Sequence, residues 1–244
     1  MPYLEVAFLV FWMEFSWAIR MKLYIAYIAI PPFFYLITYA IQHFGGVYSP
    51  FDFLWGAVAS AYLLTSFIIS LGFVQRGKSF WNLSKLAGSP PIYIYCGELS
   101  FSAFVSLGQS LIFFYLIRVG TGVGGLGSFI LFLLFTMIFS LLFTSIFLLL
   151  SRLVKFNLAK FFYLAIGLFI LLLIFSNLFI PINSLPFPIR LLAFLNPLTY
   201  GVSGISKIFT PKGDLPSLGL PLIFGIYIAL SALSLYLLSK QERQ

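Results

Sequence analysis

Residues 127–151 read GSFILFLLFTMIFSLLFTSIFLLLS, a run of 25 residues without Asp, Glu, Lys or Arg. A helix that crosses a membrane needs about 20 such residues, because each adds about 1.5 Å to a hydrocarbon core of about 30 Å. Apolar side chains fill the run instead of alternating with polar ones, which favours a helix over a barrel strand. The run therefore predicts a transmembrane helix.

Five more stretches of similar length carry no charged residue, and they lie on both sides of the first: 23–42, 53–75, 99–117, 161–180 and 218–239. The chain is 61% hydrophobic and 8% charged, whereas soluble domains are about 45–50% apolar and about 25% charged. This composition disfavours a soluble enzyme. We predict an all-α polytopic membrane protein, in which residues 1–244 form a single transmembrane domain of six helices in the lipid bilayer.

Residues 1–21 are also apolar, but they carry Glu5, Glu14 and Arg20. Each of these charges would cost about 2.5–3.5 kcal/mol at the centre of a bilayer. We therefore expect an interfacial helix at the membrane surface and not a further span.

The positive charges indicate the orientation of the chain. A net charge of +8 could suggest a nucleic-acid partner, but Lys and Arg stand in small groups between apolar blocks, so we expect none. Ten of the 14 Lys and Arg residues fall on one side of the six predicted spans, near both termini and in the loops 76–98 and 152–160. Basic segments stay in the cytoplasm, so both termini and the N-terminal interfacial helix are predicted to be cytoplasmic.

The first of these loops has a helical pattern within residues 77–88. Phe80, Leu83 and Ala87 share one face at helical spacing, and Pro90 ends the helix. The pattern predicts a short amphipathic helix. It fits a helix that rests on the lipid surface as well as one that docks a cytoplasmic partner.

Short apolar segments separated by prolines lie between the last two predicted spans. Residues 189–195 and 200–209 are too apolar for water and too short to cross a bilayer. Re-entrant or interfacial helices on the outer side fit them best. Irregular backbone at membrane depth is tolerated where protein covers it or where it lines a watery cavity, so the segment either lies near the mouth of a pathway or caps the bundle.

No pattern in the chain predicts a catalytic or metal site. Cys96 and His43 are single, and the six acidic residues lie outside the central parts of the predicted spans. No phosphate-binding GxxxxGK[ST] sequence occurs. We therefore expect no enzyme activity and no cofactor bound by this chain. A carrier with its own ion coupling would usually bury an ionisable group in the membrane, so the energy source is expected on another protein.

Two motifs resemble a known family, the membrane subunits of type-2 ATP-binding-cassette permeases. Residues 195–202, LNPLTYGV, look like the family's "NPLTY" segment before the last helix. Residues 76–90, which begin RGKSFWNL and end SP, are similar to its "RE.GT.E.L…SP" loop. Gln75 and Asn82 occupy the places where family members often carry acids.

The resemblance implies a permease that works with separate ATP-binding subunits, which hold ATP and magnesium, and that pairs with a second copy or a relative. Span one with span five is the expected contact between the two permeases. The loop after the second span would be a coupling helix that binds the ATPase through Arg76, Gly77, Lys78, Phe80, Leu83, Lys85 and Leu86. Phe80, Leu83 and Leu86 would enter a cleft on the ATPase, with the basic residues at its rim. The outer gate would contain Asn196, Pro197, Leu198 and Tyr200.

The resemblance also implies export across the plasma membrane, and the 31 Phe residues favour a hydrophobic or amphipathic compound, such as a drug, a lipid or a glycan. Polar residues within or near the spans are candidates for lining the pathway: Tyr35, Thr38, Thr65 and Asn177. A channel or secondary carrier without an ATPase partner is the alternative, and a structural membrane scaffold is a further one.

Overall fold

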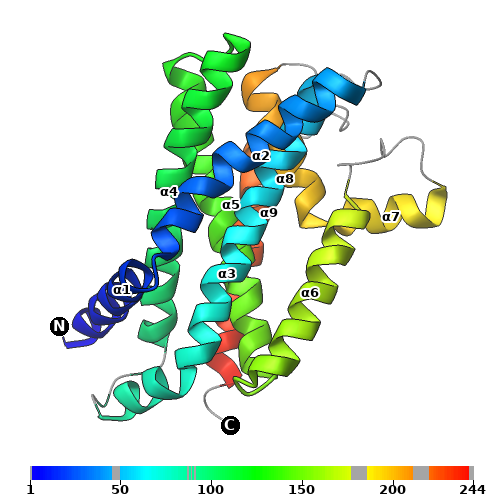
Figure 1. Cartoon of the computed structure of the whole chain (residues 1–244). Coiled ribbons are helices and arrows are strands. Elements are labelled where there is room, and N and C mark those ends of the chain that lie inside the picture. The colour runs from blue at the N-terminus through cyan, green and yellow to red at the C-terminus, as the bar shows by residue number, and fades with distance from the viewer. Residues whose placement is uncertain are drawn as a thin grey trace.

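The computed structural model describes residues 2–45, 50–86, 88, 90, 92–176, 186–210 and 220–241, and all regular structure in these ranges is helical (Figure 1). The helices are α1 (Pro2–Arg20), α2 (Leu23–Gly45), α3 (Pro50–Leu86), α4 (Ile92–Thr121), α5 (Leu126–Leu153), α6 (Leu158–Ile174), α7 (Phe187–Leu195), α8 (Pro197–Phe209) and α9 (Leu220–Gln241). The all-α class is thereby confirmed for the described residues.

Four of these helices are long and apolar enough to cross a membrane by length and composition: Leu23–Ile41, Leu54–Gly77, Ile92–Thr121 and Leu126–Leu153. They correspond to the first four predicted spans. The fifth predicted span, 161–180, is a shorter helix, α6, of 17 residues, and its last predicted residues, 177–180, lie outside the described residues. The sixth falls on α9, which contains the shorter apolar helix Pro221–Leu233.

Helix α4 is longer than the charge-free stretch 99–117 that predicted it. It begins at Ile92, after two prolines, and ends at Thr121, before Gly122, whose φ is +69°. Backbone hydrogen bonds propagate a helix through charged residues, whereas proline and a left-handed glycine end it. Glu98 and Arg118 therefore belong to the helix, near its two ends, although they lie outside the charge-free stretch that predicted it.

The amphipathic helix predicted within residues 77–88 is not separate, because its residues form the last part of α3. The last turns of α3 run sideways from the long part of the helix (Figure 1). We call residues 77–86 the docking segment, after the role that the family resemblance implies for them. Helix α1 lies across α4 at the same end of the bundle. It is not among the four candidate spans, and it carries Glu5, Glu14 and Arg20.

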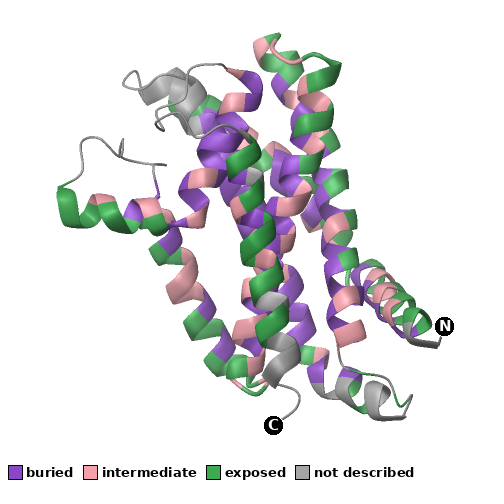
Figure 2. Cartoon of the chain, turned by 180° about the vertical axis from the view of Figure 1, so that it is seen from behind, coloured by how far each residue is buried: buried purple, intermediate pink, exposed green. Residues whose placement is uncertain are grey.

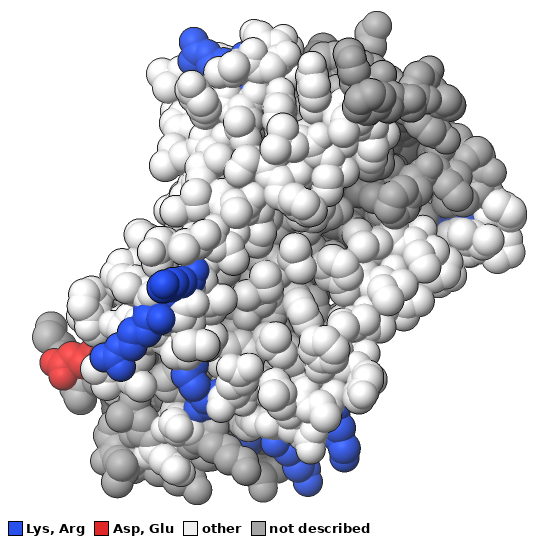
Figure 3. Space-filling view, viewed as in Figure 1, with Lys and Arg blue, Asp and Glu red and all other residues white. Residues whose placement is uncertain are grey.

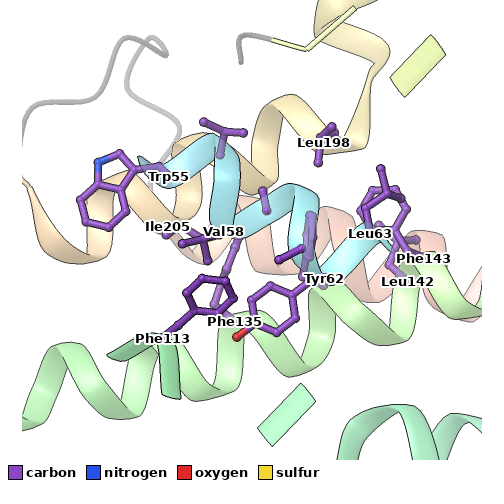
Figure 4. Packing of buried hydrophobic residues seen from close by; sticks show 14 of the residues in the cluster. Trp55, Val58, Tyr62, Leu63, Phe113, Phe135, Leu142, Phe143, Leu198 and Ile205 are labelled. Atoms are coloured by element: carbon purple, nitrogen blue, oxygen red, sulfur yellow. The ribbon is translucent and has the colours of Figure 1, made fainter. Parts of the chain in front are cut away.

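Helices α3 and α5 form the centre of the bundle, and α8 and α4 pack against them. In Figure 4, Trp55 and Tyr62 of α3, Ile205 of α8 and Phe135 of α5 converge on one cluster. The Trp55 ring stacks on Phe209 of α8 at 5.0 Å between ring centroids. Buried residues gather where the helices meet, and exposed residues cover the outer faces and α7 (Figure 2).

A ladder of hydroxyl groups joins α3, α4 and α5 inside this apolar bundle. Ser110 Oγ of α4 lies 2.7 Å from Tyr62 Oη of α3 and 2.6 Å from Thr136 Oγ1 of α5. Ser102, which lies nearer the beginning of α4, extends the ladder, because its Oγ lies 2.7 Å from Thr144 Oγ1 of α5. Hydrogen bonds of this kind hold membrane helices together where lipid offers no hydrophobic driving force. The ladder therefore fixes the register of the three helices.

Candidate functional site

Phe80 of the docking segment lies in the interior of the protein. Its side chain is 1% exposed, and its ring stacks on Phe73 at 5.6 Å between centroids. Tyr95 of α4 and Leu148 of α5 belong to the same buried cluster. The interpretation of Phe80 as a side chain that enters a cleft on a partner is therefore corrected, because the ring is already buried within its own chain.

The rest of the docking segment is described in its backbone, which is helical at Lys78, Leu83, Lys85 and Leu86. The side chains of these four residues lie outside the described part of the structure. Ser79 and Asn82 are exposed. They are three positions apart and therefore share one face of the helix.

Gly77 lets the turn after α5 approach the beginning of the docking segment. A Cβ atom at this position would lie only 2.4 Å from Cδ1 of Phe156, so a larger residue would displace the ring. Phe156 follows Lys155 in a tight turn where both residues have a positive φ, of 55° and 54°. The predicted loops 76–98 and 152–160 thus meet at one end of the bundle.

Arg76 connects the docking segment to the N-terminal helix. Its guanidinium forms an ion pair with Glu14 of α1 and lies 4.0 Å from the ring centroid of Trp17. It also lies 5.4 Å from the Phe80 ring, and its Nε donates to the Gly72 carbonyl at 3.1 Å. Arg76 therefore lies in the contact between α1 and α3 and not at the edge of an open surface.

No sequence motif indicates Glu14 and Trp17 as partners of Arg76, although α1 carries a signal for the first. Val6, Val10, Glu14 and Ala18 are all buried and follow one another every four residues. Residues four apart lie on the same face of a helix. An acid in such a row points towards the bundle, so it needs a partner there.

Asn196 joins two helices at the turn before α8. Its Oδ1 accepts from the Leu198 backbone N–H at 2.9 Å, which caps α8, and its Nδ2 donates to the Leu172 carbonyl of α6 at 2.7 Å. Asparagine suits this position because its side chain both accepts and donates. Pro197 follows at the first position of α8, where its missing N–H costs nothing.

The same turn also receives a contact from α9, because the hydroxyl of Tyr227 donates to the Pro197 carbonyl. Leu198 is fully buried, and the half-buried Tyr200 packs against the core and against Ala193 of α7. The four residues predicted for an outer gate therefore lie together at a joint between α6, α7, α8 and α9.

Helix α8 lies very close to α5 because two glycines face it. A Cβ atom at Gly201 or Gly204 would lie 2.2 Å from the ring of Phe139 or Phe135. The residues after the NPLTY motif thus bring α8 into the centre of the bundle. Two positions were open for this segment, a cap on the bundle and the mouth of a pathway. Most of α8 is buried in the protein interior, which favours the cap.

The three pathway candidates in the described part of the chain make contacts of different kinds. Thr65 is fully buried, and its hydroxyl donates to Gln109 at 3.1 Å, so it belongs to the contact between α3 and α4. Thr38 is 1% exposed and donates to the Phe34 carbonyl within α2. Tyr35 is half-buried, with its hydroxyl beside Gly120. Asn177 lies outside the described residues.

Positive charge is concentrated at the end of the molecule where α1 and the turn after α5 lie. Figure 3 shows Lys and Arg side chains gathered mostly over the lower part of the surface in this view. Exposed basic residues at this end are Arg20, Lys22, Lys155 and Lys160. The described residues contain no group of three or more His, Cys, Asp or Glu that could hold a metal ion.

Comparison with protein families gives a match to the family described as "ABC-2 type transporter", over residues 5–210. This range extends from α1 to α8 and includes both motifs. A comparison with curated proteins finds no match. Membership implies a multi-pass membrane protein that works with an ATPase, and in this family ATP is typically bound by a separate domain. The chain is therefore a member of the ABC-2 type transporter family, and it is the non-catalytic permease part of such a transporter.

Proposed function

We propose that this permease exports a hydrophobic or amphipathic compound, such as a drug, a lipid or a glycan, across the plasma membrane. Separate ATP-binding subunits supply the energy and dock on residues 77–86. The continuity of α3 carries the proposal, because this helix runs unbroken from Pro50 in the bundle to Leu86 in the docking segment. The abundance of Phe, 31 residues of 244, supports an apolar cargo.

Six helices cross the membrane in this proposal: α2, α3, α4, α5, α6 and α9. The 17 residues of α6 extend about 26 Å at about 1.5 Å each, which approaches a hydrocarbon core of about 30 Å. The basic end of the molecule faces the cytoplasm, in accordance with the positive-inside rule. This orientation places the docking segment where a cytoplasmic ATPase can reach it.

The contacts of the docking segment support its role as a lever. Its root is held by the Gly77 contact with Phe156 of the turn after α5 and by the ion pair of Arg76 with Glu14 of α1, and Phe80 stacks on Phe73 within α3 itself. A helix anchored to two other elements transmits a push as a rigid body. Movement of the ATPase subunits would thus reach α3, α1 and the turn between α5 and α6 together.

The docking face is proposed to consist of the residues beyond this root. Leu83 and Leu86 enter the cleft on the ATPase, Lys78 and Lys85 lie at its rim, and the exposed Ser79 and Asn82 complete the face. Apolar anchors inside a polar rim are the usual composition of such an interface. Phe80 supports the face from inside.

The joint at Asn196 is proposed to shape the outer gate. Its bonds to α6 and α8, and the bond of Tyr227 to Pro197, tie three helices to one turn. Rocking of the bundle would therefore move this turn as one piece. A second permease chain, identical or related, would complete the pathway, with α2 of one chain against α6 of the other. Exposed apolar side chains on both helices, such as Leu36 and Tyr163, support this pairing.

Co-purification from native membranes in mild detergent tests the proposal. The wild-type chain should bring down a soluble ATP-binding subunit, identified by mass spectrometry, in a complex whose mass contains two permease chains. Leu83→Asp should lose the ATPase, because a carboxylate cannot enter an apolar cleft without a large desolvation cost. Leu126→Asp is the matched control, since Leu126 is 74% exposed at the first residue of α5, outside the docking segment.

Two results would contradict the proposal. The first is a Leu83→Asp variant that keeps both the ATPase and ATP-dependent transport. The second is purified permease that moves solute in vesicles without any ATPase, which would favour the channel or secondary carrier.

A further inference from the structure

Three charged residues from three helices meet beside the docking segment, and we call them the carboxyl cluster: Glu14 of α1, Arg76 of α3 and Glu98 of α4. Glu14 is 1% exposed, Glu98 is fully buried, and the Arg76 side chain is 18% exposed. They lie far apart in the sequence, and Glu14 and Arg76 are 62 positions apart. The packing of α1 on α4 and the end of α3 brings them together.

The charges of the cluster do not balance if both carboxyl groups are ionised. The groups that act on these two carboxyls are each other and Arg76, and Tyr27 faces them from α2. One guanidinium would thus stand beside two carboxylates, which leaves one net negative charge in the protein interior. Burying an unpaired charge is costly, and a buried group usually takes up or loses a proton to avoid it.

The hydrogen bonds of the cluster show which group lacks a partner. Arg76 donates to Oε2 of Glu14, whereas both carboxyl oxygens of Glu98 and Oε1 of Glu14 are buried and have no hydrogen-bond partner in the described part of the chain. The Glu98 and Glu14 carboxyls lie close enough together to act on each other electrostatically. Two carboxylates only accept, so this contact becomes a hydrogen bond when one of them carries a proton.

We propose that Glu14 and Glu98 share one bound proton at neutral pH, which leaves the carboxyl cluster without net charge. Glu98 holds the proton and donates it to the Glu14 carboxylate, while the other Glu14 oxygen accepts from Arg76. Glu14 keeps the negative charge because the guanidinium is beside it. The site therefore binds a proton that joins α1 to α4, next to the docking segment.

The proton makes stability depend on pH in a defined direction. Burial raises the pKa of Glu14, and Arg76 opposes this shift. In the unfolded chain both glutamates lose their protons above about pH 4.3, so the folded chain binds one proton more. Stability is then greatest at low pH and falls as pH rises, with the unfolding constant growing about tenfold per pH unit until the folded cluster itself loses the proton.

Infrared spectroscopy of the full-length chain in lipid nanodiscs tests the proposal directly. At pH 7 the wild type should show the carbonyl stretch of a protonated carboxylic acid, shifted in heavy water. Glu98→Gln should remove this band and still fold, because a carboxamide is neutral and can donate to Glu14. Glu5→Gln is the matched control, since Glu5 is exposed on the same helix α1 and its substitution should leave the band unchanged.

A second measurement follows unfolding by detergent between pH 5 and 8. The wild type should lose stability with rising pH by the one-proton slope, and Glu98→Gln should flatten this slope relative to Glu5→Gln. Three results would overturn the proposal: no acid band in the wild type, a band that persists in Glu98→Gln, or a Glu98→Gln variant that cannot fold. Stability that follows sodium concentration instead of pH would also overturn it, because the cluster would then hold a metal cation.

Discussion

Replacing Phe80 by alanine distinguishes two roles for this residue, packing in the protein interior and binding to the ATPase. The ring is 1% exposed, stacks on Phe73 and lies 5.4 Å from the guanidinium carbon of Arg76. A buried Phe→Ala change costs about 3–5 kcal/mol, and an aromatic pair adds about 0.5–1.5 kcal/mol beyond the buried area. We expect the variant to lose about 4 kcal/mol of unfolding free energy.

The assay is equilibrium unfolding of the purified chain by detergent at fixed lipid composition, followed by tryptophan fluorescence. Phe80→Leu should cost much less, because leucine refills most of the cavity. Leu126→Ala, at an exposed position, is the control for a change of size without burial. A Phe80→Ala variant that keeps wild-type stability but no longer binds the ATPase would refute the reasoning, because Phe80 would then act at the partner surface.

Two further substitutions test the joints at the two ends of the bundle. Gly77→Ala should destabilise the chain by about 1–3 kcal/mol, because its Cβ would meet the Phe156 ring. Gly108→Ala is the control, since its Cβ would lie in open space, and this variant should be neutral or slightly stabilising. Equal stability of the two variants in thermal unfolding would contradict the close contact at Gly77. Asn196→Ala should cost about 2 kcal/mol, from a lost helix cap and a buried Leu172 carbonyl left unpaired. Hydrogen exchange at the start of α8 should rise with it, and unchanged protection there would argue against the joint.

The positions of the apolar helices follow from the sequence because membrane thickness sets the length of a span. Residues 127–151 predict α5 within one or two residues at each end. The two short helices α7 and α8 were also expected, since proline separates two apolar segments too short to cross a bilayer. Charge-free length is a poorer guide to helix ends, as α4 shows, because a helix continues through a charged residue such as Glu98 that the fold can accommodate.

The hydroxyl ladder shows that local sequence patterns do not predict which helices pack against each other. Thr136, Ser140 and Thr144 follow each other every four residues on α5, so the sequence reveals a polar stripe. The sequence does not show which helix this stripe faces. Ser102 and Ser110 of α4 meet it only because α4 and α5 pack side by side.

The sequence by itself determined the class of the protein, the approximate location of most apolar helices, the two motifs and through them the family. These features are local, since hydropathy and motif spacing act over one or two dozen consecutive residues. Only the tertiary structure decided that Phe80 is an interior anchor and that Asn196 joins α6 to α8. It also decided that Glu14, Arg76 and Glu98 form one cluster, because burial and charge balance depend on which distant helices meet.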